Sequence, residues 1–309
     1  MKHLPRASCA GILLFPLVLL ACNLQDQSAA PLTIETDCLY QIAFGTESSI
    51  QLLDLSEGQT VNLTSDLDSA AYPAWSPDAQ RLAFTSVVRN GTYSGAEVFT
   101  VKADGTDLAR LTDHFGDYMR PSWSPDGSLI LFSTPNYGYF QIGTVEVDPP
   151  HTETLLTSLR SKNLTPAWSP SGEFIAFSSN RSGAADVYVM DAQGDNIVRL
   201  TSSQGEDSWP AWSPDGTQIA FVSERDGNEE IYLMNADGSR QVNLTNDSRT
   251  DTMPSWSPDG AYLAFASDRS TRKFQIYLVR PDASDLIRLT STSPGKYWPA
   301  WRPSCGDHE

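Results

Sequence analysis

The chain has 309 residues, of which 21 are Lys or Arg and 38 are Asp or Glu, so its formal net charge at pH 7 is −17. An acidic excess of this size argues against binding to nucleic acid and against adsorption to an anionic membrane surface. The same charge favours solubility, which is its simplest explanation.

The N-terminus has the pattern of an export signal. A positively charged start and a short apolar stretch, residues 10–20, precede the sequence Leu-Leu-Ala-Cys that ends at Cys22. This pattern resembles a bacterial lipobox cut before Cys22, and the apolar stretch is short for a transmembrane helix. We therefore expect residues 1–21 to be a lipoprotein signal peptide and Cys22 to carry the lipid. The alternative is an ordinary signal peptide with a cysteine near its cleavage site by coincidence.

Residues 22–37 are rich in Gln, Ser, Ala and Pro and poor in apolar residues, which predicts a flexible tether. Two or more acyl chains on one cysteine would give stable anchoring. We expect a lipid-anchored protein of the cell envelope. In a cell with two membranes it would lie on the outer membrane facing the periplasm, and otherwise on the outer face of the cell membrane.

The rest of the chain repeats one pattern. A tryptophan followed two residues later by proline occurs six times at intervals of 44 to 48 residues, and each full unit ends in Leu-Thr. A fixed period in this range predicts a propeller or a solenoid. The six tryptophans are Trp75, Trp123, Trp168, Trp212, Trp256 and Trp301.

One unit shows the expected elements. Four short strands, separated by turn residues, are predicted at Ala211–Ser213, Gln218–Val222, Glu230–Asn235 and Gln241–Leu244. The second strand is apolar at consecutive positions, which is typical of a sheet covered on both faces. This is the situation of a propeller blade between two neighbours.

The two ends of the repeat array complement each other. Residues 39–64 lack the tryptophan strand, whereas residues 299–303 supply only that strand. Sharing one blade between them would close the ring and remove exposed sheet edges. We predict an all-β fold, a six-bladed β-propeller of four-stranded blades over residues 38–305, closed by N- and C-terminal strands in one blade, with residues 306–309 as a tail.

The repeated text Pro-Ala-Trp-Ser-Pro-Asp-Gly, followed by Ile-Ala-Phe and Asn-Ala-Asp-Gly, resembles the PD40 repeat of TolB-like six-bladed propellers, relatives of WD40 blades. The resemblance covers residues 38–303. It departs at residues 147–151, which replace a usual turn, and at Arg302, which replaces serine. TolB proteins also carry an α/β domain before the propeller; with about fifteen residues between the expected cleavage site and the first strand, this sequence resembles the propeller without that domain. Because the resemblance covers the propeller and not that domain, it gives only weak support for the role of TolB in the Tol-Pal envelope system.

Two cysteines belong to the propeller. Superimposing the blades puts Cys38 and Cys305 on adjacent positions of the same turn, at the point where the chain of the closing blade is interrupted. An oxidising envelope permits a disulfide there, and such a bridge could contribute roughly 4 to 5 kcal/mol in the chain-entropy model. The alternative is two unrelated free thiols.

Residues suited to catalysis are scarce. His114 and His151 are expected on opposite faces of the disc, and no Gly-Xaa-Ser-Xaa-Gly motif is present. We expect no catalytic residue, no metal site and no cofactor, although aspartates in the channel could hold calcium. The turn aspartates are better explained as caps of local backbone; they are Asp78, Asp126, Asp215 and Asp259.

One face of the disc offers residues that turn formation does not require, in the loops after the second and fourth strands. Arginine and aromatic residues are enriched in binding sites, although the aromatics could equally pack beneath the loops. Three arginines recur four residues after the repeat phenylalanine, and we expect ion pairs with Asp207 and Asp251 of adjacent blades. The candidate binding face consists of Arg89, Asp117, Tyr118, Tyr137, Arg181, Asp207, Trp209, Arg225, Asp251, Arg269, Tyr297 and Trp298.

Two functions of different class fit these observations. The first is a non-catalytic, monomeric propeller that binds an envelope protein or a glycan, with no nucleic-acid partner and a membrane contact only through the lipid on Cys22. The second is an envelope lyase or hydrolase acting on carbohydrate, with carboxylates as acid and base. A pair of carboxylates in a deep pocket would favour the enzyme.

Overall fold

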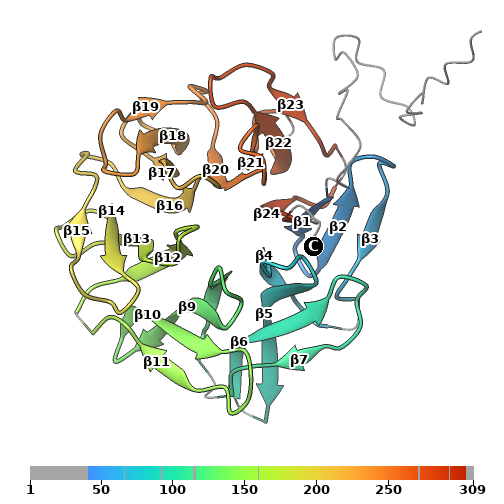
Figure 1. The fold of residues 1–309 in the computed structure, drawn as a ribbon. Helices are drawn as coiled ribbons and strands as arrows, with labels where there is room; N and C mark the ends of the chain where they lie inside the picture. The colour runs from blue at the N-terminus through green and yellow to red at the C-terminus, as the bar shows by residue number, and fades with distance from the viewer. Residues whose placement is uncertain are drawn as a thin grey trace, which may run out of the picture.

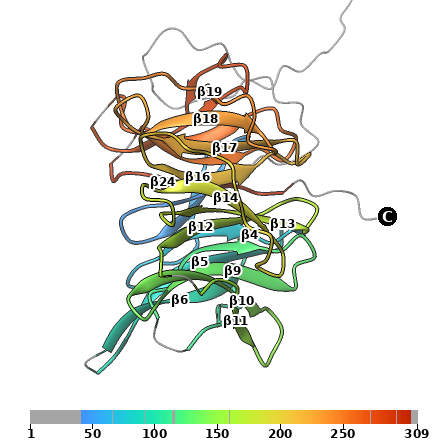
Figure 2. The ribbon, with the colours of Figure 1, turned by 90° about the vertical axis from the view of Figure 1, so that its left-hand side faces the viewer.

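The computed structural model describes residues 41–303, apart from residues 66, 92, 114, 115, 159, 271 and 292. Six four-stranded antiparallel sheets are arranged as blades around a central channel (Figure 1), and Figure 2 views the ring from its edge. The fold prediction is confirmed. Within the described residues, no helix is long and apolar enough to cross a bilayer.

The blades are numbered here along the chain. Blade 1 contains β24 (Tyr297–Trp301), β1 (Gln41–Gly45), β2 (Ile50–Asp54) and β3 (Thr60–Asn62). Blade 2 contains β4 (Ala71–Trp75), β5 (Arg81–Asn90), β6 (Tyr93–Lys102) and β7 (Ala109–Arg110). Blade 3 contains β8 (Met119–Trp123), β9 (Leu129–Asn136), β10 (Tyr139–Glu146) and β11 (Glu153–Leu155).

The other three blades follow the same order from channel to rim. Blade 4 contains β12 (Asn163–Trp168), β13 (Phe174–Ser179), β14 (Asp186–Asp191) and β15 (Val198–Arg199). Blade 5 contains β16 (Asp207–Trp212), β17 (Gln218–Ser223), β18 (Glu230–Asn235) and β19 (Val242–Asn243). Blade 6 contains β20 (Asp251–Trp256), β21 (Leu263–Ser267), β22 (Gln275–Val279) and β23 (Ile287–Arg288).

The core lies between blades. The second strand of every blade carries a phenylalanine that is at most 1% exposed, which explains the consecutive apolar residues there. The repeat tryptophans stand beside the channel, and two of their indoles bond the preceding blade. Trp123 Nε1 donates to the Ala74 carbonyl, and Trp256 Nε1 donates to the Ala211 carbonyl, both at 3.1 Å.

The recurring Leu-Thr pair has a structural cause. In every blade the threonine Oγ1 accepts a hydrogen bond from a backbone N–H of the third strand, at 2.8 to 3.1 Å. The third strand is thereby paired where the short outer strand ends, so that no buried N–H is left unsatisfied. The threonines are Thr64, Thr112, Thr157, Thr201, Thr245 and Thr290.

The turn aspartates cap local backbone, as predicted. In each turn, Oδ1 accepts from the serine hydroxyl two residues earlier, at 2.5 or 2.6 Å, and from the N–H two residues later, at 3.0 Å. These hydrogen bonds hold the pKa of Asp126 and Asp215 below its usual value.

The ring closes through β24 and β1. Ile42 lies opposite Trp301 and Ala43 opposite Ala300, so both ends of the propeller share blade 1. Cys38 and Cys305 lie outside the described residues, and their disulfide stays a prediction. Arg302, which occupies the serine position of the repeat, contributes to this closure. Arg302 donates two hydrogen bonds to the Ala79 carbonyl of blade 2, at 2.8 and 3.1 Å, and one to Gln41 Oε1 at 2.7 Å.

We predict that Arg302→Ala lowers the free energy of unfolding by about 2 kcal/mol, because it removes charge-assisted hydrogen bonds that join the last strand to blades 1 and 2. The guanidinium also stands 4.9 Å from the centroid of the Trp75 ring. Urea denaturation measures the loss. Arg89→Ala is the matched control, since Arg89 and its ion-pair partner Asp68 are 69% and 71% exposed. A loss no greater than that of the control would contradict this role.

Candidate functional site

The first strand of each blade lines the channel and contains a β-bulge. In blade 5, Ser208 pairs with Val222 and Ala211 with Ala220, so one extra residue lies between these pairs. The same shift occurs in the other five blades. Bulges re-aim side chains and are common beside functional sites.

The bulged residue has the same unusual backbone in all six blades. Its φ lies between 52° and 61°, and a proline follows it each time. A positive φ is unfavourable for a residue with a side chain, and a following proline restricts the backbone of this residue further. The recurrence shows that the bulge belongs to the scaffold of every blade, whereas the side chain that it carries differs from blade to blade. These residues, here called the bulge ring, are Tyr72, Arg120, Thr165, Trp209, Met253 and Trp298.

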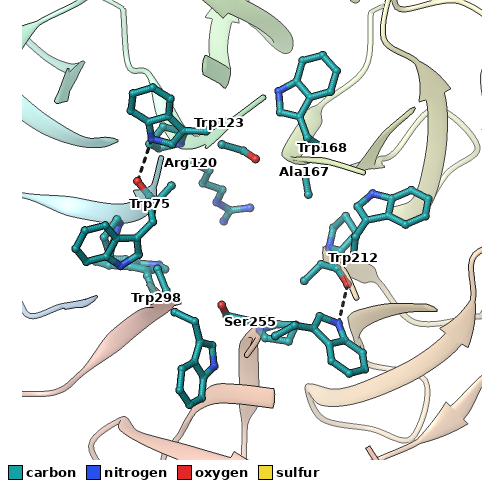
Figure 3. A pocket seen from close by; sticks show the side chains of 18 of the residues that line it. Trp75, Arg120, Trp123, Ala167, Trp168, Trp212, Ser255 and Trp298 are labelled. Carbon is teal, nitrogen blue, oxygen red and sulfur yellow. Dashed lines mark hydrogen bonds between the residues drawn. The ribbon is translucent and has the colours of Figure 1, made fainter. Parts of the chain in front are cut away.

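Four members of the bulge ring contact one another across the channel. The rings of Tyr72 and Trp298 are 4.4 Å apart, and those of Tyr72 and Trp209, from the opposite blades 2 and 5, are 6.4 Å apart. The Arg120 guanidinium lies over the Trp209 ring, 3.7 Å from its centroid. Side chains therefore obstruct the channel at this level, and Figure 3 shows Arg120 pointing into it.

A cavity of about 670 Å³ extends from the bulge ring to the six prolines that stand two residues after the repeat tryptophans. Its wall consists of tryptophans and of six small residues that are all partly exposed: Ala74, Ser122, Ala167, Ala211, Ser255 and Ala300. Small residues at this position in all six blades leave the channel open below the obstruction. The volume falls in the range typical of ligand sites.

The cavity offers two kinds of contact. Tryptophan and proline provide an apolar wall, whereas Arg120 Nε and Trp298 Nε1 are buried donors without a hydrogen-bond partner in the described part of the chain. Burial lowers the pKa of Arg120 to about 10, so the guanidinium still carries its charge at neutral pH. The cavity is therefore suited to a ligand that combines apolar groups with carbonyl or carboxylate oxygens.

The cavity lining contains no acid or histidine among its residues, all of which are described. Likewise, no group of three or more His, Cys, Asp or Glu side chains that could hold a metal ion is found among the described residues. The carboxylate pair that would have favoured a glycoside hydrolase is thus not part of this cavity.

Comparison with known proteins agrees with this architecture. The model of the PD40 family, the TolB beta propeller domain, matches residues 39–155, 150–241 and 208–307. The chain belongs to the TolB beta-propeller domain family.

Several solved structures share the fold of this TolB-type propeller. TolB from Acinetobacter baumannii has a TM-score of 0.72 at 22% identity, covering 86% of this chain and 67% of that one. A chain of a nidogen/laminin complex has a TM-score of 0.69 at 11% identity, covering 85% of this chain and 98% of that one. A puromycin-hydrolyzing peptidase of Mycobacterium tuberculosis has a TM-score of 0.59 at 14% identity, covering 81% of this chain and 43% of that one.

Two curated relatives match parts of the TolB-type propeller. The peptidase YuxL of Bacillus subtilis, described as uncharacterized, is 34% identical over 84 residues, which are 27% of this chain and 12% of the relative. The uncharacterized protein Atu1656 of Agrobacterium fabrum is 30% identical over 118 residues, 38% of each chain. The chain thus spans well under two thirds of either relative.

The candidate binding face of the sequence analysis is only partly exposed in this TolB-type propeller. Tyr137 is 96% exposed at the β9–β10 turn, and Arg89 and Asp117 are also exposed. Tyr118 is buried, and its hydroxyl donates to Glu153 Oε2 at 2.7 Å. Tyr297 packs with Phe274, their ring centroids 5.4 Å apart. These residues do not form one cluster with the channel cavity.

The recurring arginines are structural. Arg225 lies against the rings of Phe221 and Tyr232 and binds Asp207 at 3.2 Å, while Arg269 binds Asp251 at 2.5 Å. Both pairs join strands of one blade, so the expectation of pairing between adjacent blades is corrected. The acid begins the inner strand and the arginine follows the adjacent strand, which brings them together at one end of the sheet. Arg181 instead donates to the Asn163 amide oxygen at 3.0 Å.

Trp209 and Trp298 are the two predicted residues that line the cavity. Both were expected in loops, but they belong to β16 and β24. The bulge ring, and the place of Tyr72 and Arg120 in it, were not predicted from the sequence. A signal was present, because the residue that precedes proline and stands three positions before each repeat tryptophan differs in nature within an otherwise repeated motif.

Proposed function

We propose that this chain is a lipid-anchored envelope protein that binds a polypeptide segment of another envelope protein in its channel cavity and does not catalyse a reaction. The observation that carries this proposal is the cavity itself. It combines an apolar wall with buried donors that have no partner among the described residues, namely Arg120 Nε and the indole Nε1 atoms of Trp75, Trp168, Trp212 and Trp298, and none of its lining residues is an acid or a histidine.

A polypeptide segment fits this combination well. Its backbone carbonyls accept hydrogen bonds from the guanidinium and the indole, while its apolar side chains pack on tryptophan and proline. The strained backbone of the bulge ring supports the same view, since it aims six side chains of differing chemistry into one space. Apolar segments also avoid repulsion by an acidic protein surface.

The envelope assignment is supported by the signal-like residues before Cys22 and by membership of the TolB family. The lipid on Cys22, the outer-membrane location and the monomeric state belong to the proposal. No feature of the cavity favours the carbohydrate-active enzyme, because its lining lacks the two carboxylates that such chemistry uses.

The test is cross-linking of the lipoprotein to its partners in intact envelopes, followed by affinity capture. We expect a protein partner to be recovered. If that partner is a Pal-like lipoprotein, the chain resembles TolB in its role as well as in its fold. Recovery of polysaccharide alone would overturn the proposal.

Filling the channel gives the matched comparison. We predict that Ala167→Trp weakens capture by about tenfold or more, because a large side chain on the wall occupies the cavity. Val198→Trp is the control, since Val198 is 57% exposed on the rim strand β15. Circular dichroism checks that both variants fold. Equal capture by the two variants would place the binding site outside the channel.

A further inference from the structure

A second cavity of about 440 Å³ lies outside the channel, at the seam between blades 6 and 1. Phe44, Gln51 and Leu53 of blade 1 form one side, together with residues of β3. The segment that leads from β23 to β24 forms the other side, from Leu289 to Lys296. Leu53 and Leu289 also share one hydrophobic cluster, so the two blades are packed together around this cavity, here called the seam pocket.

The seam pocket exists because blade 1 lacks two large side chains that other blades have. In blade 5 the repeat phenylalanine, Phe221, lies opposite Tyr232 on the third strand. The Arg225 guanidinium lies against both rings, with its Cζ 5.5 and 4.6 Å from their centroids. Blades 4 and 6 have the same three residue types, so aromatic rings and guanidinium fill this space there.

Blade 1 has different residues at both positions. Phe44 lies opposite Gln51 instead of a tyrosine, and Ser48 stands four residues after Phe44, where blades 4 to 6 have arginine. Both replacements are smaller and polar. The result is a cavity with polar lining residues beside the buried Phe44 side chain.

The inner-strand position of this group is also changed. Blades 5 and 6 have Asp207 and Asp251 there, five residues before the repeat tryptophan, whereas blade 1 has Lys296. Lys296 is 4% exposed and lines the seam pocket, and its Nζ lies 5.6 Å from the centroid of the Phe44 ring. Blade 1 therefore has a cation where blades 5 and 6 have an acid and its arginine partner.

No carboxylate among the described residues forms an ion pair with Lys296, and burial alone lowers its pKa. A buried ammonium group without a counter-charge is energetically costly, so the site favours a bound anion. The surrounding polar groups are also free to bind. The side chains of Gln51, Ser291 and Ser293 line the pocket and make no hydrogen bond within the part of the chain that the structure describes.

We propose that the seam pocket binds a small hydroxylated monocarboxylate of the size of a sugar acid. Its carboxylate pairs with Lys296 Nζ, and its hydroxyls bond Gln51, Ser291 and Ser293. The single cation matches one negative charge. Phosphate esters match less well, because the lining residues include no arginine.

The probe is D-glucuronate, titrated into the purified protein by isothermal calorimetry. We expect saturable binding that Lys296→Met weakens by about tenfold or more, since a charge-assisted contact is lost. Glucose and acetate should bind more weakly than glucuronate, because each lacks one half of the recognised chemistry. Gln51→Tyr should abolish binding without unfolding the protein, because it restores the residue type that fills this space in blades 4 to 6.

Ala167→Trp separates this site from the channel, and should leave glucuronate binding unchanged even if it ends partner capture. If Lys296→Met does not fold, Gln51→Tyr decides the question. The proposal would be overturned if glucuronate at a concentration on the order of 10 mM gave no heat of binding, because a complex with a millimolar Kd would be largely saturated there. Unchanged affinity in folded Gln51→Tyr, or tighter binding of glucose 6-phosphate than of glucuronate, would also overturn it.

Discussion

Arg269→Met is expected to lower the free energy of unfolding by about 3–5 kcal/mol, because it leaves a buried carboxylate without its counter-charge. Asp251 is fully buried, and the side chain of Arg269 is 11% exposed, with 2.5 Å between Nη2 and Oδ2. Methionine retains the apolar length that packs on Phe265 and Tyr277, so most of the loss comes from the charge. Urea denaturation near neutral pH measures it.

The loss should depend on pH. Burial raises the pKa of Asp251 above its usual value, against the lowering by Ser267 and Arg269, and removing Arg269 should raise the pKa further. A carboxyl whose pKa is higher in the folded state favours folding at low pH and loses that contribution as pH rises. The difference between wild type and Arg269→Met should therefore be larger at about pH 8 than at about pH 5.

Blade 4 supplies the control for this charge effect. Arg181 lies against the equivalent rings of Phe177 and Tyr188 but donates to a neutral residue, Asn163. Arg181→Met should cost about 1 kcal/mol, because it removes hydrogen bonds without exposing a buried charge. The same loss in both variants, with no pH dependence, would show that the Asp251 carboxylate does not need its partner.

The ring could be predicted because repetition reveals it. Each repeat tryptophan marks an inner strand, and a Leu-Thr pair marks the end of each unit. Together they predict the number of blades and the closure of the ring without knowledge of any contact. The structure supplies the reason for the threonine, whose Oγ1 completes the pairing of the third strand. Repeated residues are thus those that every blade needs, and they describe the scaffold well.

The channel could not be read in the same way. The sequence predicts that the inner strand of blade 5 begins at Ala211, whereas β16 begins at Asp207 and contains Pro210. Proline is tolerated there because the inner strand is an edge strand and the bulge already interrupts its pairing. The bulge also changes which face of the sheet the following side chains point to. Trp209 therefore belongs to a strand and points into the channel.

The seam pocket shows a further limit. Gln51, Ser48 and Lys296 are visible in the sequence as departures from the repeat, but their effect depends on what fills the space that they leave. In blade 3 the third-strand position is Gly143, and Tyr118, which directly precedes the inner strand, packs against Phe132 with 4.9 Å between the ring centroids. Blade 1 has no such replacement, and a cavity remains. Whether a cavity remains depends on how neighbouring side chains pack, and the period of the repeat does not predict that packing.

The closing disulfide carries the largest expected effect. Ile42 faces Trp301, and the N–H of Arg302 donates to the Gln41 carbonyl at 2.9 Å, so the antiparallel register holds to the last described residues on both strands. Cys38 and Cys305 lie just beyond these residues in the sequence and outside the described part of the chain. We therefore expect Cys38 and Cys305 to form a disulfide in an oxidising compartment.

A bridge across so long a loop contributes about 5 kcal/mol in the chain-entropy model, so Cys38→Ser combined with Cys305→Ser should destabilise the protein by up to that amount. Urea denaturation of wild type with and without reductant, beside the double variant, measures the difference. The double variant is itself the control for the reductant, because its stability should not change on reduction. Two free thiols, alkylated in the native protein after secretion, would rule the bridge out and leave Arg302 and the β24–β1 pairing as the described contacts that close the ring.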